Sequence, residues 1–426
     1  MNLSGTEKKQ IKDQVVLWGL VVLVAALMGV VSHLLLLALH TATEFREGHN
    51  FLLLALPFVG VLTAFVYQNF GQGSQKGNNL IIESTQKEIH VPFRMGIFTF
   101  IFTILTHLFG GSAGREGSAV QIGGVLANQA GKRVGLPFEM RKKLIHAGVS
   151  AGFASIFGTP LAGAFFGMEI VYIGKMERSS LIYCFFAAYF SNFIAKSLGT
   201  THDLHQIVDM PAVSVKVLVV VCLAAVLYGV FGFLFSFVVS TLKKFYQAKI
   251  SNYLLRALVS ATIFVVLILL LSGQKYEGLS LNLMDEAFAG QSTFLDPILK
   301  LMYTGLTLGA GFQGGEVTPL FDIGSSLGSS IGNLVHVSPS FLAALGLISV
   351  FGCAANAPIT TIMLGVDLFG VQALPYYAIA SFISYSVTGH HGIYGSQTVI
   401  VAKHVFLQEH VGYRLSEIKS NKGKRV

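Results

Sequence analysis

Six apolar runs constrain this chain more than any other feature of its sequence. They cover residues 15–39, 51–70, 93–110, 181–197, 217–242 and 254–272. A helix needs about 20 mostly apolar residues to cross the hydrocarbon core of a bilayer. Charged residues make up only 12% of the chain, which is about half of their share in a soluble domain. The sequence therefore predicts an all-α polytopic membrane protein.

Basic clusters flank these apolar runs. The net charge is +8, and the clusters are Lys8, Lys9 and Lys12; Arg141, Lys142 and Lys143; Lys243, Lys244 and Lys249; and Lys419, Lys422, Lys424 and Arg425. A nucleic-acid-binding protein gathers such charge on one folded face, whereas these positions follow the positive-inside rule. We therefore expect no nucleic-acid partner and both termini in the cytoplasm. The first run is too long for the apolar region of a signal peptide, so we expect it to be retained as a helix.

The two halves of the chain carry matching motifs. Gly158-Thr-Pro-Leu-Ala-Gly-Ala-Phe-Phe-Gly-Met-Glu169 aligns with Asn356-Ala-Pro-Ile-Thr-Thr-Ile-Met-Leu-Gly-Val-Asp367 at an offset of 198 residues. Gly114-Arg-Glu-Gly-Ser-Ala-Val-Gln-Ile-Gly123 parallels Gly314-Gly-Glu-Val-Thr-Pro-Leu-Phe-Asp-Ile-Gly324 at an offset of 200 to 201. Two matches at nearly one offset indicate an internal repeat.

Repeats with short apolar segments that glycine or proline interrupts are typical of transporters, whose sites lie where broken helices meet near the midplane. Residues 118–130 and 318–334 are such segments, and irregular backbone at this depth must be buried in protein or line a cavity. We predict two inverted-topology helical repeats with broken, re-entrant helices. The predicted parts are a cytoplasmic N-terminal segment (1–13), a first transmembrane repeat (14–205), a second transmembrane repeat (206–405) and a cytoplasmic C-terminal tail (406–426).

A glycine-rich loop precedes a helix in each repeat. The start of a helix has unpaired N–H groups and a partial positive charge, so it binds an anion without a full cation. Gly114 and Gly117 flank one such start, and Gly314 and Gly315 precede the other. The alternative is that these glycines only allow close helix packing, as small residues do in membranes. We expect that alternative to hold for most of the 46 glycines, but not for these two clusters.

Glu116 lies inside the first of these loops. An ionised side chain at membrane depth costs about 2.5–3.5 kcal/mol on insertion scales, so it indicates function. Ionised, Glu116 can occupy an anion site itself, and protonated it gains nothing from the positive helix ends. We therefore predict that Glu116 is a gate that couples proton uptake to anion movement. The alternative is an ion pair with Arg115, although adjacent residues on a helix face different directions.

These motifs resemble the CLC family of anion channels and proton-coupled antiporters. Residues 114–117 are similar to its gate motif, 314–319 to its second-half anion loop, and 158–163 to a loop and helix of the first half. Tyr394 stands where the family has its anion-coordinating tyrosine. The resemblance covers about residues 14–405. It implies the two-repeat helical fold and a homodimer in a prokaryotic inner or plasma membrane, with one pathway in each subunit.

Three departures from the family pattern indicate its fluoride/proton antiporter branch. The first anion loop reads Gly77-Asn78-Asn79 without the usual serine, Ile170 replaces the inner proton-carrying glutamate, and Glu316 and Thr318 stand in a loop that is usually apolar. An asparagine amide offers two N–H donors where serine offers one O–H, which suits a small, strongly hydrated anion. A chloride/proton antiporter or a chloride channel is the alternative.

The resemblance thus implies fluoride and protons as the transported ions. Glu116 and Glu316 are the predicted gating and proton-transfer residues. The predicted anion-binding set is Gly77, Asn78, Asn79, Gly114, Arg115, Gly117, Glu316, Val317, Thr318 and Tyr394.

Simpler roles remain open for several members of this set. Asn78 is also explained as a turn residue, and Asn79 competes with it for the anion. Thr318 is also explained as a cap of a helix that starts at Pro319. Tyr394 is also explained as a buried tyrosine with a partner elsewhere.

An enzymatic function is the remote alternative. Gly148-Val-Ser150-Ala-Gly152 matches the Gly-x-Ser-x-Gly motif of serine hydrolases, which requires a strand-to-helix turn. No such context is evident, so we expect no enzyme. His390 and His391 are adjacent, but a metal site needs further spaced ligands. We therefore expect neither a cofactor nor a metal.

Overall fold

The computed structural model describes residues 4–202 and 205–421. Lys422, Lys424 and Arg425 of the C-terminal basic cluster lie outside the described residues. The helices of the first half are α1 (Gly5–Glu47), η1 (Asn50–Ala55), α2 (Leu56–Phe70), η2 (Ser74–Lys76), α3 (Asn78–Gln86), α4 (Arg94–Leu108), α5 (Glu116–Arg133), α6 (Phe138–Phe157), α7 (Pro160–Glu169), η3 (Arg178–Ser180) and α8 (Leu181–Ser197).

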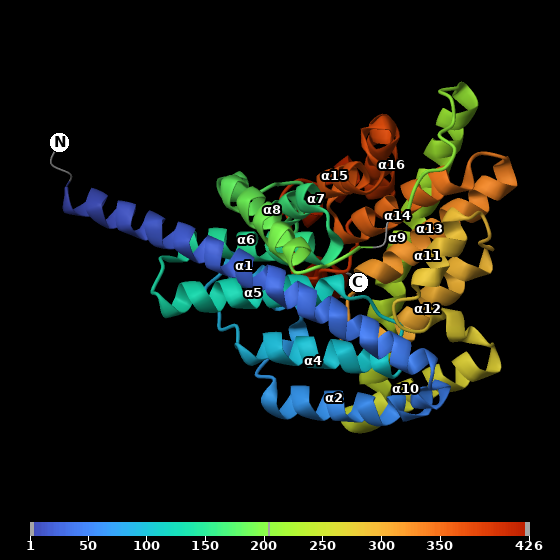
Figure 1. Cartoon of the computed structure of the whole chain (residues 1–426), viewed down its shortest axis with the longest axis horizontal. Helices are drawn as coiled ribbons and strands as arrows, with labels where there is room; N and C mark the ends of the chain where they lie inside the picture. The colour runs from blue at the N-terminus through green and yellow to red at the C-terminus, as the bar shows by residue number, and fades with distance from the viewer. Residues whose placement is uncertain (1–3, 203–204, 422–426) are drawn as a thin grey trace.

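The second half repeats this pattern. Its helices are α9 (Val215–Lys249), α10 (Tyr253–Leu270), η4 (Gly273–Tyr276), α11 (Leu281–Phe288), α12 (Leu295–Ala310), α13 (Val317–Val335), α14 (Pro339–Ala355), α15 (Pro358–Phe369), η5 (Val371–Ala373), α16 (Leu374–Thr388), η6 (Val405–His410) and α17 (Leu415–Asn421). In Figure 1, α1, α5, α4 and α2 lie side by side on one side of the molecule, and α9 and α11 to α14 lie on the other.

Two short parallel strands, β1 (Tyr172–Ile173) and β2 (Thr398–Val399), pair with each other and so join the two halves. Tyr172 stands opposite Thr398. The pair ties the segment after Tyr394 to the end of α7. The fold is otherwise helical, as the sequence predicts.

All six apolar runs form helices. Within the described residues, four helices are long and apolar enough to cross a membrane: Thr6–Glu47, Asn50–Phe70, Val215–Lys249 and Tyr253–Leu270. The runs that form α4 and α8 are shorter, with 15 and 17 residues. Local signals explain where the long helices begin. Ser4 and Glu7 form a capping box at α1, and Ser214 caps α9, which satisfies N–H groups that a helix start leaves free.

The repeat has a structural counterpart in three helix pairs. α5, α6 and α7 of the first half correspond in order and length to α13, α14 and α15 of the second. The loops in front of α5 and α13 meet, because Gly114 and Gly315 form an antiparallel bridge. The predicted fold class is therefore confirmed. The residues at which the two repeats begin and end stay predictions.

The ends of α7 and α15 stabilise each other. Glu169, the last residue of α7, accepts hydrogen bonds from the backbone N–H groups of Ile359 and Thr360, at the start of α15. Asp367, near the end of α15, accepts one from the N–H of Ala162, at the start of α7. Each acid therefore satisfies orphan N–H groups of the other repeat's helix and complements its positive end.

Glycine allows the broken helices to pack closely. A Cβ on Gly123 of α5 would lie 2.1 Å from the carbonyl oxygen of Gly148 on α6, and a Cβ on Gly324 of α13 would lie 2.1 Å from that of Gly346 on α14. Both helix pairs thus touch backbone to backbone, as small residues permit in membranes. α13 is buried over most of its length, as expected for a segment that does not face lipid.

Candidate anion site

Three helix starts meet at one place inside the protein. α3 begins at Asn78, α5 at Glu116 and α13 at Val317. Gly114 and Gly315 exchange both backbone hydrogen bonds, at 2.7 and 2.6 Å between nitrogen and oxygen. A Cβ on Gly315 would lie 2.7 Å from the nitrogen of Gly117, so only glycine permits this contact. The positive ends of helices from both repeats therefore converge.

Glu116 lies at this convergence with only 1% of its surface exposed. Its Oε2 accepts hydrogen bonds from the backbone N–H of Thr318, at 3.2 Å, and from the hydroxyl of Thr318. It also accepts one from the N–H of Arg115, at 3.1 Å. The carboxylate thus occupies the start of α13 as a bound anion would.

Arg115 also contacts Glu116, with 3.5 Å between Nε and Oε1. The argument that adjacent residues face different directions is therefore wrong here. It applies within a helix, whereas Arg115 is the N-cap of α5 and lies outside its regular turns. The ion pair and the contact with α13 use different oxygens of the same carboxylate, so the one does not exclude the other.

The structure separates the roles of Asn78 and Asn79. The Asn79 Oδ1 accepts a hydrogen bond from the N–H of Ser396 at 2.9 Å, which holds the segment after Tyr394. The Asn78 amide nitrogen lies beside Gly117, 3.3 Å from where a Cβ would stand, and its buried Oδ1 has no hydrogen-bond partner among the described residues. Asn78 therefore faces the site. Gly77 precedes it with φ of +58°, which favours glycine.

Glu316, not Thr318, is the cap residue at the start of α13. The helix begins at the buried Val317. Thr318 does not cap a helix that starts at Pro319, so that alternative is wrong, and its hydroxyl binds Glu116 instead. Glu316 is half-buried, and Lys243 near the end of α9 acts on it electrostatically. No hydrogen bond joins the described side chains of Glu316 and Glu116.

Tyr394 is 1% exposed, and its hydroxyl has no hydrogen-bond partner among the described residues. Both Glu116 and Glu316 act on it electrostatically. A buried hydroxyl normally has a partner. The alternative of a tyrosine satisfied elsewhere in the described chain is therefore wrong, and the free hydroxyl lies near both acids.

A vestibule of about 740 Å³ opens beside Arg115. Arg46, Glu47 and Glu277 line it together with Arg115. Since α1 ends at Glu47, the vestibule lies at the opposite end of α1 from the N-terminus. Arg115 thus contacts both the vestibule and Glu116.

Sequence reasoning missed a buried ion pair. Lys300 on α12 and Asp322 on α13 are both 0% exposed, with 3.2 Å between Nζ and Oδ2. Lys300 also donates to the hydroxyl of Ser280 at 2.8 Å, and Ser280 lines the vestibule. Asp322 stands one turn after Thr318, where Glu116 acts on it electrostatically. The sequence contained a signal for this pair, because a charged residue at membrane depth indicates a paired or functional group.

Comparison with known proteins agrees with this geometry. The family model of the voltage-gated chloride channels matches residues 59–389. The chain belongs to the CLC family. It is 39% identical over 409 residues to the chloride/fluoride channel protein of Pseudomonas syringae pv. tomato, covering 93% of this chain and 89% of that one.

Two further CLC proteins can be compared with this chain. The crystal structure of a CLC-type fluoride/proton antiporter matches with a TM-score of 0.88 and 34% identity, covering 93% of this chain and 100% of that one. The H(+)/Cl(-) exchange transporter ClcA of Vibrio cholerae is 25% identical over 274 residues, which cover 60% of this chain and 58% of that one. The chain is thus more similar to the fluoride-linked CLC proteins than to this chloride exchanger.

The structure also shows where the hydrolase-like motif and the adjacent histidines lie. Ser150 lies inside α6, so residues 148–152 form no strand-to-helix turn. His390 and His410 lie with 3.0 Å between their Nδ1 atoms. In the part of the chain that the structure describes, no group of three or more histidine, cysteine or acidic residues is placed to hold a metal.

Proposed function

We propose that this CLC protein exchanges fluoride for protons across a membrane, with Glu116 as the gate that carries the proton. The observation that supports this is the Glu116 carboxylate at the start of α13. It occupies the place that a transported anion needs. Ionised, it competes with the anion for the same N–H and O–H donors. Protonated, it loses its attraction to the helix ends and gives way to the anion.

Fluoride is favoured over chloride by the donors that face this place. Asn78 offers an amide, and Thr318 offers both a hydroxyl and a backbone N–H. A small, strongly hydrated anion needs several short hydrogen bonds to replace its water. The likeness to the chloride/fluoride channel protein and to the fluoride/proton antiporter supports the same choice. Chloride/proton exchange is the second candidate, and selectivity is a difference of affinities that only measurement decides.

Glu316 is proposed as the second proton carrier. Lys243 near the end of α9 acts on it electrostatically. Tyr394 lies within electrostatic reach of both Glu116 and Glu316. We further propose a homodimer in a prokaryotic inner or plasma membrane, with both termini cytoplasmic, and a transporter rather than an enzyme.

A flux assay in proteoliposomes tests the exchange. Vesicles loaded with fluoride in fluoride-free buffer should take up protons, recorded with an internal pH dye while a fluoride electrode follows release. Chloride-loaded vesicles should release their anion at least about ten-fold more slowly. Protein-free vesicles measure the passive permeation of hydrogen fluoride and are subtracted. Chloride release at an equal or greater rate would contradict the fluoride assignment, and fluoride release without proton uptake would contradict the exchange.

Replacing Thr318 by valine should loosen the gate. The substitution keeps the shape and the backbone N–H of residue 318 but removes the hydroxyl that binds Glu116. A hydrogen bond to a charged group contributes about 1.5–3 kcal/mol, and about 1.4 kcal/mol is ten-fold in an equilibrium. We expect the ratio of fluoride released to protons taken up to rise about ten-fold. Thr318→Ser keeps the hydroxyl and is the matched control. An unchanged ratio in Thr318→Val would refute this role.

A further inference from the structure

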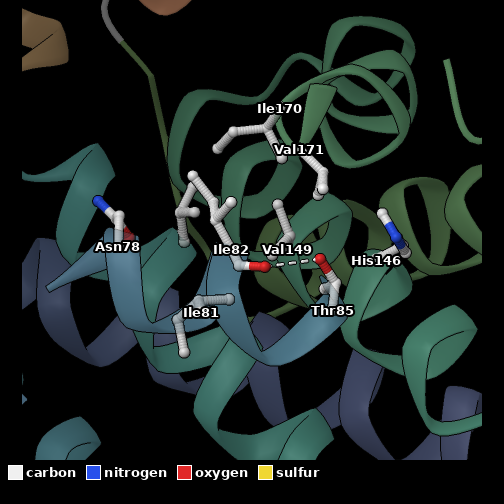
Figure 2. Close-up of a pocket in the computed structure, with 9 residues that line it drawn as sticks. Asn78, Ile81, Ile82, Thr85, His146, Val149, Ile170 and Val171 are labelled. Atoms are coloured by element: carbon white, nitrogen blue, oxygen red, sulfur yellow. Dashed lines mark hydrogen bonds between the residues drawn. The ribbon is translucent and has the colours of Figure 1, made fainter. Parts of the chain in front are cut away.

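A small cavity lies between α3, α5, α6 and the end of α7. Its volume of about 10 Å³ is near the lower limit for one water molecule. Figure 2 shows Asn78 and His146 at opposite ends of it, with Ile82, Val149 and Ile170 between them. The Thr85 hydroxyl donates to the carbonyl of Ile82 at 2.8 Å, so toward the cavity it can only accept a hydrogen bond. The polar side chains that line the cavity are therefore Asn78, Thr85 and His146.

His146 has one nitrogen without a partner. Its Nδ1 lies 2.5 Å from the carbonyl oxygen of Gly167. A carbonyl only accepts, so Nδ1 carries the hydrogen and the Nε2 of the neutral ring is a bare acceptor. This Nε2 has no hydrogen-bond partner among the described residues, and the side chain is 1% exposed. A buried acceptor without a partner costs about 1–3 kcal/mol, which a water molecule or a proton would remove.

The other end of the cavity is lined by Asn78, which faces the anion site. The Oδ1 of Asn78 is also buried and unpaired, and the amide of Asn78 lies beside Gly117, one residue from Glu116. Ile170 lines the same cavity and has no group that can carry a proton. Of the described residues that line it, His146 is the one that can titrate.

Burial and two charged groups act on the ring of His146. Burial is the largest influence and opposes a proton on the ring. The carbonyl of Gly167 and Glu177, in the loop before α8, favour a proton, and Lys142, one turn earlier on α6, opposes it. α1, α3, α5 and α7 add no further charge to it among the described residues, and Cys184 of α8 is a buried thiol near Ser150. Burial would raise the pKa of Glu177, but hydrogen bonds from Ser179 and Lys142 outweigh it and lower the pKa. Glu177 therefore stays ionised.

We propose that this cavity binds one water molecule and that His146 exchanges a proton with it, which links the Lys142 end of α6 to Asn78 at the anion site. Uptake forms one N–H bond at Nε2 and breaks one O–H bond of a hydrated proton. Release toward the Asn78 end reverses this, so that no electron moves and one proton is passed on. The proposal rests on the proton exchange proposed above, and it names a residue for a step that Ile170 cannot perform.

Two substitutions test the site in different ways. His146→Gln removes the basic nitrogen but keeps a donor for the carbonyl of Gly167, and Val149→Leu keeps His146 but fills the water space. In the proteoliposome assay, both should lower proton uptake about ten-fold or more, while fluoride binding by the purified protein stays within about two-fold of wild type. Ser150→Ala changes a buried hydroxyl one turn along the same helix and should leave proton uptake unchanged. Wild-type proton uptake in both His146→Gln and Val149→Leu would overturn the proposal.

Nitrogen NMR of histidine-labelled full-length protein in lipid gives a readout independent of transport. One Nε2 signal, absent in His146→Gln, should pass from the bare to the protonated position as the pH falls, and Val149→Leu should shift it. A His146 signal that stays bare at every pH where the protein is folded would overturn the proposal. A wild-type protein that moves no protons but shows the titrating signal would refute the proposed exchange and leave the site standing.

Discussion

Glu116→Gln is expected to abolish proton transport. Glutamine has the shape of the protonated carboxyl, and its carbonyl oxygen can accept from the N–H and hydroxyl of Thr318 that now bind Glu116. It can neither take up nor release a proton. Because a positioned proton donor or acceptor contributes about 10² to 10⁴-fold to a rate, fluoride-driven proton uptake should fall by about 100-fold or more.

The experiment compares proton and fluoride fluxes in the same vesicles. Fluoride binding should persist in Glu116→Gln, since the helix starts and Asn78 are unchanged. Glu47→Gln is a suitable control, because Glu47 lines the vestibule but its side chain is 62% exposed. Proton uptake that survives in Glu116→Gln would remove Glu116 from the gate and move the proton step to another acid.

Lys300→Met is expected to destabilise the fold strongly. Lys300 and Asp322 are both fully buried and pair with each other. Removing one partner of a buried pair leaves an uncompensated charge and costs about 3–5 kcal/mol. We expect a loss of this size in the free energy of unfolding, measured by denaturation of the purified protein in mixed micelles.

The double substitution separates pairing from packing. Adding Asp322→Asn to Lys300→Met removes the second charge as well, and should recover most of the loss because neutral replacements of a buried pair are often tolerated. Glu286→Gln is the control for an exposed pair, since Glu286 and Lys275 are 36% and 40% exposed and lie 3.3 Å apart, where about 0–1 kcal/mol is expected. A Lys300→Met protein as stable as wild type would show that the pair contributes nothing.

Sequence reasoning reached the site through local signals. The two glycine-rich loops, Glu116 and Tyr394 were identified without coordinates, and the structure brings them together. It failed where a contact joins distant segments. The capping role, considered as the alternative for Thr318, is wrong because its hydroxyl binds Glu116, 202 residues away. Local signals also could not show the partners of Glu169 and Asp367, because each pairs with a helix start of the other repeat.

The choice between Asn78 and Asn79 shows the same limit. Both are polar and adjacent, so composition and turn chemistry treat them alike. Only the loop after Tyr394 distinguishes them, since Ser396 donates to Asn79 and leaves Asn78 to face Gly117.

The sequence by itself determined the membrane class, the internal repeat and the acid at the helix start, because hydrophobic length, motif offset and loop composition are properties of neighbouring residues. The tertiary structure alone decided the pairing of Lys300 with Asp322, the bare nitrogen of His146 and the occupation of the α13 start by Glu116. These depend on helices about 20 to 200 residues apart in the chain, and their contacts arise only when the two repeats pack.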